Sequence, residues 1–334
     1  MEKKSIRDVN LFGKRVLVRV DFNVPMDEQG NIEDDTRIRA SLPTIEYILD
    51  ANGKVILMSH LGRPRGRDPK YSLLPVAKRL SRYLNKEVLM ANDCIGEEVK
   101  KMVEGMKEGD VILLENLRFH KEEESDENFA RELASLGDVY VSDAVGTCHR
   151  KHASVYIVPQ TLKPAVMGFL LEKEISYFKK AMINPQRPVV ALLGGAKVSS
   201  KIGIIKNLLK RVDKIFVGGA MAFTFVRAMG YDVGSSVLED GFLDTARDIM
   251  DIAKKLGVKF YLPIDFVLGK EFSDSTPTRI VPWQDIPPGW MGLDIGPVSV
   301  SFLREIISDA QTIIWNGPMG AFELDRFKDG TYET

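Results

Sequence analysis

The sequence predicts an α/β fold with parallel sheets that is divided into about two domains. Short apolar runs recur along its 334 residues, and a Gly-rich or polar loop follows each of them. Runs of about four to six residues without polar alternation are typical of parallel strands buried on both faces. Segments with helical spacing lie between the runs, which indicates strand-helix-strand units. The chain is longer than one hydrophobic core usually organises, so two domains are expected.

The expected strands fall into two groups of four. The first group precedes residue 160 and occupies residues 15–20, 55–58, 111–114 and 139–141. The second group occupies residues 189–193, 214–217, 259–262 and 312–315. β-Branched residues are frequent in these runs, which favours a strand over a helix in segments of this length.

Helical periodicity marks several segments between these strands. Residues 74–84 and 202–212 carry apolar side chains three and four positions apart, which predicts amphipathic helices. Residues 168–182 form a further predicted helix, which stops before the Asn184-Pro185 pair. The acidic run at 121–127 is interpreted as a solvated loop or the start of a helix.

Composition argues against several classes of protein. The 46 Lys and Arg residues are balanced by 47 Asp and Glu residues, and 44% of all residues are hydrophobic. A chain with this hydrophobic fraction is not expected to be disordered. A chain with almost no net charge has no overall electrostatic attraction for nucleic acid or an anionic membrane. The start lacks a secretory signal, and no stretch approaches the roughly 20 apolar residues of a membrane span. We therefore expect a cytoplasmic protein with neither nucleic acid nor membrane as a partner.

The two cysteines, Cys94 and Cys148, lack the spacing of a metal or redox motif. They are predicted to be reduced thiols, buried or partly buried. No HExxH motif and no Cys/His cluster with zinc spacing occurs, so no protein-bound metal is predicted.

The loops after the strands differ in chemistry between the two halves of the chain. All four histidines lie in or just after strand-end loops of the first half, whereas Gly-Gly pairs follow strands of the second half. This change predicts an N-terminal domain over residues 1–167 and a C-terminal domain over residues 183–334. The helix at 168–182 is the expected link between them.

Cationic and hydrogen-bonding side chains follow each strand of the first half. These groups lie in residues 19–23, 59–64, 115–120 and 149–152, and Arg37 adds another guanidinium at the expected start of a helix. Ligands of open α/β sheets bind beyond the carboxyl ends of the strands, and a guanidinium suits phosphate and carboxylate. A pocket for a small polyanion is therefore predicted. Ordinary surface ion pairs, or a nucleic-acid loop at 63–67, are the weaker alternatives.

Glycines and lysines follow the first strand of the second half. Residues 193–201 run from a strand toward a helix, and Lys197 and Lys201, four apart, are expected on one helical face at its N-terminus. The pattern is neither a P-loop nor the GxGxxG fingerprint. Similar glycine turns at 218–221 and 316–318 favour a nucleotide cradle. A tight turn with exposed lysines is the alternative.

Taken together, these segments closely resemble phosphoglycerate kinase. The resemblance rests on seven motifs in order along the chain: RVDFNVP at 19–25, SHLGRP at 59–64, LENLRFH at 114–120, GGAKV at 194–198, GGAMAFT at 218–224, GWMGLDIGP at 289–297 and WNGPMG at 315–320. It implies two Rossmann-like domains with parallel sheets, a bilobal kinase with an interdomain hinge helix. It also implies a monomer that transfers a phosphoryl group reversibly between 1,3-bisphosphoglycerate and ADP, giving 3-phosphoglycerate and ATP with Mg2+ carried by the nucleotide.

The resemblance also implies roles for individual residues. The substrate-binding positions are Asp21, Asn23, Arg37, His60, Arg63, Arg118 and Arg150. The nucleotide-binding positions are Gly194, Gly195, Lys197, Lys201, Gly218, Gly219, Gly292, Asn316 and Glu323. Arg37 and Lys197 match the catalytic groups that steady the transferring phosphoryl, whose charge is spread over its oxygens.

The sequence departs from the family pattern at its end. The printed chain stops at Thr334 and contains neither the GGGDS/T nor the TGGGA motif of the family. An incomplete C-terminal nucleotide-binding domain is therefore expected. The alternative to a kinase is a noncatalytic 3-phosphoglycerate-binding fragment or regulatory paralogue, but retention of Arg37, Lys197 and Lys201 favours catalysis.

Overall fold

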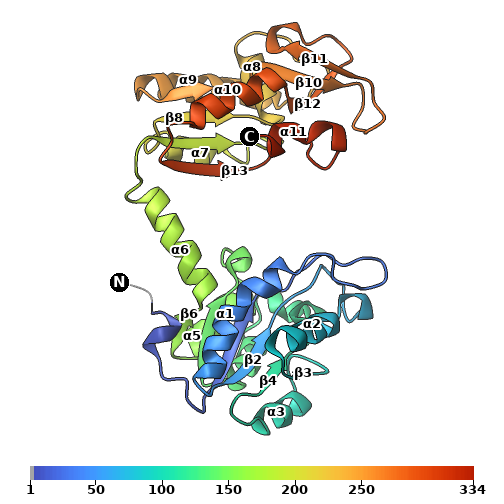
Figure 1. Ribbon diagram of the computed structural model, residues 1–334, viewed down its shortest axis with the longest axis vertical. Coiled ribbons are helices and arrows are strands. Elements are labelled where there is room, and N and C mark those ends of the chain that lie inside the picture. The colour runs from blue at the N-terminus through green and yellow to red at the C-terminus, as the bar shows by residue number, and fades with distance from the viewer. Residues whose placement is uncertain (1–3) are drawn as a thin grey trace. The chain divides into compact units, whose positions relative to one another are not determined.

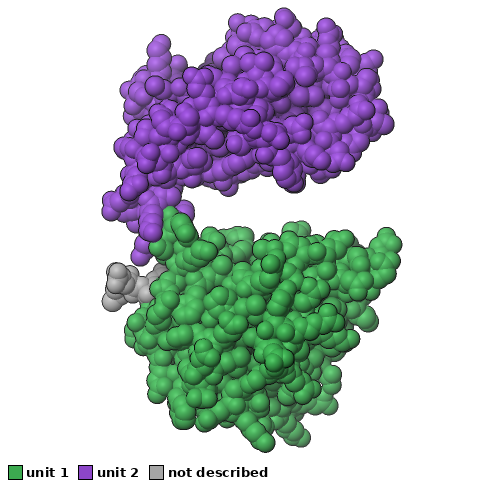
Figure 2. All heavy atoms as spheres, in the orientation of Figure 1, with its two compact units in different colours: residues 1–177 green, residues 178–334 purple. Residues whose placement is uncertain are grey.

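The computed structural model describes residues 4–334 (Figure 1), so the first three residues of the predicted N-terminal domain lie outside it. The chain divides into two compact units, the first ending at Tyr177 and the second beginning at Phe178 (Figure 2). This division falls inside helix α6 (Phe169–Met182), at the position of the predicted linker helix. Each unit contains its own sheet and hydrophobic core.

A six-stranded parallel sheet forms the centre of unit 1. Its strand order is β3-β4-β2-β1-β5-β6. The strands are β1 (Arg15–Val20), β2 (Lys54–Met58), β3 (Val88–Met90), β4 (Val111–Leu113), β5 (Val139–Asp143) and β6 (Ala165–Met167). The four predicted strands are confirmed, whereas β3 and β6 were not predicted. Both missed strands lie at the edges of the sheet and have only three residues each.

Helices cover both faces of this sheet. They are α1 (Thr36–Asp50), α2 (Leu74–Leu84), α3 (Glu97–Glu104), α4 (Glu127–Ser135) and α5 (Val158–Thr161). Successive residues of β1 enter different cores: Val16 and Val18 pack with α1 and α2, whereas Leu17 packs with α3 and α4. Burial on both sides explains why the strand sequences are apolar without alternation.

Unit 2 contains a parallel and an antiparallel sheet. The parallel sheet has the order β13-β7-β8-β9, and the antiparallel sheet has the order β11-β10-β12. The parallel strands are β7 (Val189–Leu193), β8 (Lys214–Val217), β9 (Lys259–Tyr261) and β13 (Thr312–Asn316). The antiparallel strands are β10 (Asp265–Gly269), β11 (Thr278–Pro282) and β12 (Met291–Ile295).

The parallel sheet of unit 2 agrees with the expected fold class, whereas the antiparallel sheet of the same unit was not predicted. In β11 only Val281 is buried, so this strand lacks the continuous apolar run that marked the parallel strands. The remaining helices are α7 (Ile202–Leu208), α8 (Met221–Ala228), α9 (Leu243–Lys255), α10 (Pro297–Ile307) and α11 (Asp329–Tyr332). Helix α7 ends four residues before the predicted boundary at 212.

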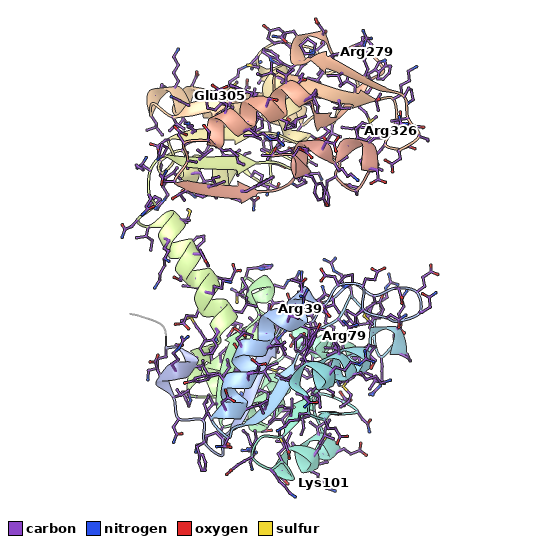
Figure 3. The ribbon with its side chains drawn as sticks, viewed as in Figure 1. Arg39, Arg79, Lys101, Arg279, Glu305 and Arg326 are labelled. Atoms are coloured by element: carbon purple, nitrogen blue, oxygen red, sulfur yellow. The ribbon has the colours of Figure 1, made fainter. Side chains whose placement is uncertain are left out.

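An ion-pair cluster joins the first two helices of unit 1. Asp35, just before α1, accepts from Arg39 at 2.9 Å and also pairs with Arg79 of α2. Both arginines are labelled in Figure 3. The Tyr83 hydroxyl also donates to the Asp35 carboxylate, at 2.5 Å. The hydrogen bond from Tyr83 and the arginine charges lower the pKa of Asp35. This cluster fixes the start of α1, on which Arg37 lies.

Two further expectations concern membranes and cysteines. Within residues 4–334, no helix combines the length and the hydrophobicity that crossing a membrane requires.

Cys94 is buried as expected, whereas Cys148 is exposed, which corrects the prediction of two buried or partly buried thiols. The Cys148 thiol donates to the Ala144 carbonyl oxygen at 3.3 Å on a loop surface.

Candidate functional site

A polar cavity of about 280 Å³ lies in unit 1 beyond the carboxyl ends of the sheet strands. Because parallel strands end at one edge, the loops after β1, β2, β4 and β5 meet there, together with the first turn of α1. The cavity is lined by all seven residues that the sequence singled out for this half: Asp21, Asn23, Arg37, His60, Arg63, Arg118 and Arg150. Gly62, Gly146 and Thr147 complete the lining.

Hydrogen bonds hold the lining in place. Arg37 donates to the Asp21 carboxylate at 2.6 Å. The Asn23 side chain accepts from the Gly62 amide at 2.8 Å, and Arg118 donates to the Gly62 carbonyl oxygen at 2.6 Å. The loop after β2 is thus fixed by residues from two other strand ends.

The cavity carries excess positive charge. Among the described residues, Arg63, Arg118 and Arg150 form no ion pair. Burial, Arg150 and Arg19 together lower the pKa of Arg118. The same three arginines also line a larger polar cavity of about 570 Å³. Guanidinium groups that form no ion pair and surround one space favour a ligand with several negative charges.

His60 is buried in this positive environment. Only 5% of the residue is exposed, and burial together with Arg19, Arg118, Arg150 and Arg37 lowers the pKa of His60 to about 2. The ring is therefore neutral over the physiological pH range. A neutral imidazole can still donate one hydrogen bond to an anion.

Glu123 corrects the interpretation of the acidic run at 121–127. The 3-10 turn Lys121–Glu124 buries Glu123 to 2% exposure, and Ser154 donates to it from its amide at 3.1 Å and its hydroxyl at 2.5 Å. Burial raises the pKa of this carboxyl despite the nearby Arg19 charge. Nothing in the sequence distinguishes Glu123 from its exposed neighbours, so sequence reasoning missed it.

A second group that sequence reasoning missed contains Asp93, Cys94 and His120. Their potential ligand atoms lie within 4.8 Å of one another. The donors are already engaged, because Asp93 accepts from His120 at 2.7 Å and from the Cys94 amide at 2.7 Å. Burial also raises the pKa of the Cys94 thiol well above its usual value, which keeps it protonated. This group locks two loops of unit 1 together.

Three glycine-containing turns interlock in unit 2. Gly195 donates to the Pro318 carbonyl oxygen at 3.0 Å, and Gly219 donates to that of Met319 at 3.0 Å. A Cβ atom on Gly194 would lie 1.9 Å from the Pro318 carbonyl oxygen, so this contact requires glycine. The turns after β7, β8 and β13 thus form one backbone surface at the carboxyl ends of these strands.

The two lysines beside this surface are not on a helix, which corrects the prediction. Helix α7 begins at Ile202, so Lys197 and Lys201 lie in the preceding loop. Ser199 anchors this loop by donating from its amide and hydroxyl to Glu239 at 2.9 and 2.6 Å. Lys197 is exposed, whereas Lys201 is half-buried and donates to the Asn316 side chain.

A cavity of about 360 Å³ adjoins the glycine turns. Four of the expected nucleotide-binding positions line it, namely Gly195, Gly219, Gly292 and Glu323. The other five, Gly194, Lys197, Lys201, Gly218 and Asn316, do not. Gly194 and Gly218 pack against the Pro318-Met319 turn, and Lys201 and Asn316 bind each other beside it. The structure thus brings together four of the nine predicted positions in the cavity itself.

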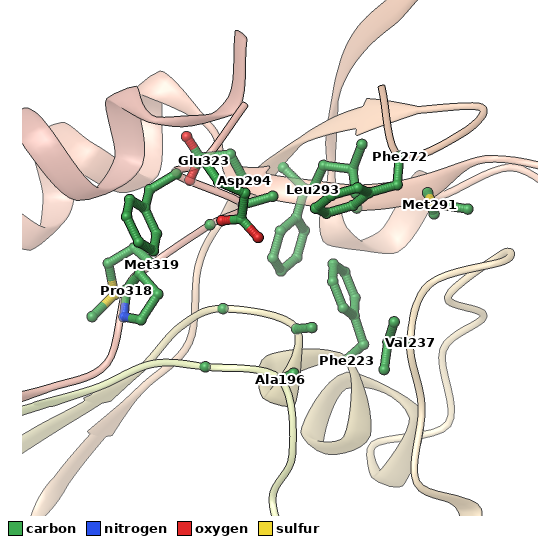
Figure 4. Close-up of a pocket in the computed structure, with 18 residues that line it drawn as sticks. Ala196, Phe223, Val237, Phe272, Met291, Leu293, Asp294, Pro318, Met319 and Glu323 are labelled. Atoms are coloured by element: carbon green, nitrogen blue, oxygen red, sulfur yellow. The ribbon is translucent and has the colours of Figure 1, made fainter. Parts of the chain in front are cut away.

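Apolar side chains form most of this cavity, and the sequence did not identify them. Figure 4 shows Phe223, Val237, Phe272 and Met291 around it. The Phe223 ring lies under Gly292, where an added Cβ would approach it to 2.0 Å. A flat ring system suits such a space, and the adjacent backbone amides and lysines suit attached anionic groups.

Asp294 also lines this cavity. The residue is 3% exposed, and its carboxylate accepts from the Gly330 amide at 2.7 Å and the Ile295 amide at 2.9 Å. Burial raises the pKa of Asp294 to about 7, although these two hydrogen bonds oppose the shift. The side chain holds α11 against β12.

Comparison with known proteins gives consistent matches. A family model described as phosphoglycerate kinase matches residues 6–334. The chain is 75% identical over 334 residues to a phosphoglycerate kinase of Aquifex aeolicus (strain VF5), covering 100% of this chain and 84% of the relative. It is 72% identical over 332 residues to that of Hydrogenobaculum sp. (strain Y04AAS1), covering 99% and 84%. A solved structure of phosphoglycerate kinase from Coxiella burnetii matches with a TM-score of 0.85 and 38% identity, covering 99% of this chain and 84% of that chain.

Proposed function

The chain belongs to the phosphoglycerate kinase family, and we propose that its two cavities hold the two substrates of that reaction. As a phosphotransferase, it transfers a phosphoryl group reversibly between 1,3-bisphosphoglycerate and ADP, giving 3-phosphoglycerate and ATP. The alternative of a noncatalytic binding fragment or paralogue is not favoured by these matches. The observation that carries the assignment of substrates is the gathering of seven predicted polar residues around one positive cavity.

The cavity of unit 1 is the proposed site for 3-phosphoglycerate and 1,3-bisphosphoglycerate. Arg63, Arg118 and Arg150 supply guanidinium groups that can bind phosphate and carboxylate oxygens in pairs. The 3-phosphoglycerate molecule also carries a hydroxyl group between its phosphate and its carboxylate. The side chains of Asp21 and Asn23 provide hydrogen-bond acceptors and donors that suit this hydroxyl group. The ion pair between Asp21 and Arg37 at 2.6 Å supports a fixed starting position for the Arg37 guanidinium.

The cavity of unit 2 is the proposed site for ADP and ATP, bound with Mg2+ as part of the substrate. Its apolar side chains suit the adenine ring, and the Gly195 and Gly219 turns adjoin the space where the phosphates would extend. Lys201, beside these turns, is the proposed partner of a nucleotide phosphate oxygen. Gly194, Gly218, Asn316 and Glu323 are proposed to shape this site rather than to react.

The chemistry needs no nucleophilic side chain. A β-phosphate oxygen of ADP attacks the acyl phosphate, so one phosphorus-oxygen bond forms while the bond to the carboxylate oxygen breaks. The protein supplies position and charge: Arg37 and Lys197 are proposed to stabilise the negative charge spread over the transferring group. Because these residues lie on different units, we further propose that the reaction depends on hinge bending about α6.

A monomeric state and a cytoplasmic location remain predictions. The nearly balanced charge of the sequence gives neither nucleic acid nor an anionic membrane a general electrostatic attraction.

Isothermal calorimetry tests the assignment of substrates to units. Arg63→Ala is expected to weaken 3-phosphoglycerate binding by roughly 10-fold or more, the effect of losing a charged hydrogen bond, and to leave Mg-ADP binding unchanged. Arg82→Ala, at an exposed position on α2, is the matched control and should change neither affinity. Loss of nucleotide affinity with intact 3-phosphoglycerate affinity in Arg63→Ala would overturn the assignment.

A further inference from the structure

Arg19 is a fully buried arginine behind the substrate cavity. It lies on β1 with 1% of its surface exposed. Its guanidinium makes three contacts: Nε donates to the Ser154 hydroxyl at 2.9 Å, Nη1 donates to the Val20 carbonyl oxygen, and Nη2 lies 3.2 Å from His60 Nδ1. Arg19 does not line the cavity, so it acts only through the groups that it holds.

The contact with Arg19 determines the proton position on His60. A guanidinium has only donors and stays protonated at every relevant pH, so His60 Nδ1 must accept the hydrogen bond. An accepting Nδ1 carries no proton, and the proton of the neutral ring therefore lies on Nε2. Within residues 4–334, no protein group forms a hydrogen bond with Nε2, while the His60 ring lines the cavity.

A buried carboxylate balances the Arg19 charge. Glu123 accepts from the Ser154 hydroxyl at 2.5 Å, and that hydroxyl accepts in turn from Arg19 Nε at 2.9 Å. The order of groups is therefore Glu123, Ser154, Arg19, His60 and cavity. Burying an arginine without such compensation would be costly, so this arrangement is built to keep Arg19 at this position.

We propose that Arg19 is a positioning residue for substrate binding, because it fixes His60 as the Nε2-protonated neutral tautomer that donates to an anionic oxygen of phosphoglycerate. The opposite tautomer would present a lone pair to that oxygen and repel it. The proposal rests on the assignment of this cavity to phosphoglycerate. Five charged residues besides Arg19 surround the His60 position: Asp21, Arg37, Arg63, Arg118 and Arg150.

Nitrogen-15 NMR of the imidazole rings tests the tautomer without requiring activity. His60 is assigned among the four histidines with a His60→Gln variant. Between pH 5 and 8 we expect a protonated Nε2, an unprotonated Nδ1 and no titration. A proton on Nδ1, or titration of the ring in this range, would overturn the proposal even if the chain binds phosphoglycerate.

Variants test whether Arg19 causes this state. The double variant Arg19→Met with Glu123→Gln removes both buried charges together. Its reference is the single variant Glu123→Gln, because this chain keeps the contact between Arg19 and His60. Relative to that reference, the double variant should give a mixture of His60 tautomers and about 10-fold weaker 3-phosphoglycerate binding by calorimetry. Arg15→Met, on the same strand but paired with Asp138, should change neither readout. A double variant with unchanged tautomer and affinity would contradict the proposal.

Discussion

Arg37 illustrates how a single contact can hold an exposed side chain at the cavity of unit 1. The residue lies in the first turn of α1, and 51% of its side chain is exposed. Its ion pair with Asp21 at 2.6 Å holds the guanidinium at the cavity, although such an exposed pair adds little to stability. Its effect should therefore appear in turnover rather than in folding.

Arg37→Ala is expected to lower kcat by roughly 100-fold, the effect of removing one preorganised donor from a charged transition state. The melting temperature should change little, because the side chain is half exposed. Arg39→Ala is the control, since Arg39 lies on the same helix (Figure 3) but pairs with Asp35. Steady-state kinetics and thermal melting check both variants, and equal loss of turnover in both would remove Arg37 from the mechanism.

Asp294 gives a pH-dependent prediction for unit 2. Its folded pKa of about 7 lies above the roughly 3.9 of an unfolded aspartate, so the folded unit binds the proton more tightly. The contribution of Asp294 to stability is therefore complete below about pH 4 and is lost as the pH rises through about 7. Asp294→Asn cannot titrate and should flatten this decline.

Tryptophan fluorescence measures this effect in unit 2 alone, because all three tryptophans, Trp283, Trp290 and Trp315, lie there. As the pH rises from 5 to 8, wild type should lose more unfolding free energy than Asp294→Asn, because a tenfold change in proton affinity corresponds to about 1.4 kcal/mol. Asp251→Asn, exposed on α9, should retain the wild-type slope. Identical slopes in all three chains would rule out a raised pKa at Asp294.

At the scale of elements, continuous apolar sequence predicted the central strands well. Strands β1 and β7 match the predicted ranges because burial on both faces leaves no polar positions in them. The antiparallel strand β11 was missed because four of its five residues are exposed. Helical periodicity predicted a helix to residue 212, whereas α7 ends at Leu208. The prediction ran too far because Leu209 and Val212, in the turn that follows, are also buried.

The site was predictable where its residues follow strands in recognisable motifs, as Asp21 and His60 do. It was not predictable where long-range packing determines the environment of a residue. Glu123 is buried by its contact with Ser154, 31 positions away. Arg19 lies in a cationic segment that the sequence marked, but its contact with His60, 41 positions away, follows only from the fold.

The glycine turns of unit 2 give a test at this scale. Gly219 has a φ of +64°, and an added Cβ would lie 2.5 Å from the Gly195 amide nitrogen. Gly219→Ala is therefore expected to lower the unfolding free energy by about 1–2 kcal/mol, because the left-handed conformation is strained for alanine, and to weaken Mg-ADP binding.

Gly203→Ala is the matched control, because Gly203 lies in α7 and an added Cβ meets nothing within 4 Å. Alanine at this position should raise the unfolding free energy by about 0.5–1 kcal/mol and leave nucleotide affinity unchanged. Chemical denaturation and calorimetry separate the two variants. If Gly219→Ala were as stable as wild type and bound Mg-ADP as tightly, the claim that the glycine turns interlock would be contradicted.

At the scale of the whole molecule, each unit has its own core and its own cavity. Ligands added singly should therefore protect different parts of the chain from hydrogen exchange. We expect 3-phosphoglycerate to slow exchange in residues 59–66 and 144–152, and Mg-ADP to slow it in residues 193–201 and 316–323. Protection of the same unit by both ligands would contradict the division of substrates.

The most direct measurement is a coupled assay of ATP-dependent phosphorylation of 3-phosphoglycerate, using purified chain whose mass confirms the 334 residues. The account predicts Mg2+-dependent turnover that is strongly reduced in both Arg37→Ala and Lys197→Ala. A folded chain that binds both substrates by calorimetry but transfers no phosphoryl group would contradict it, and would identify this chain as a phosphoglycerate-binding protein instead.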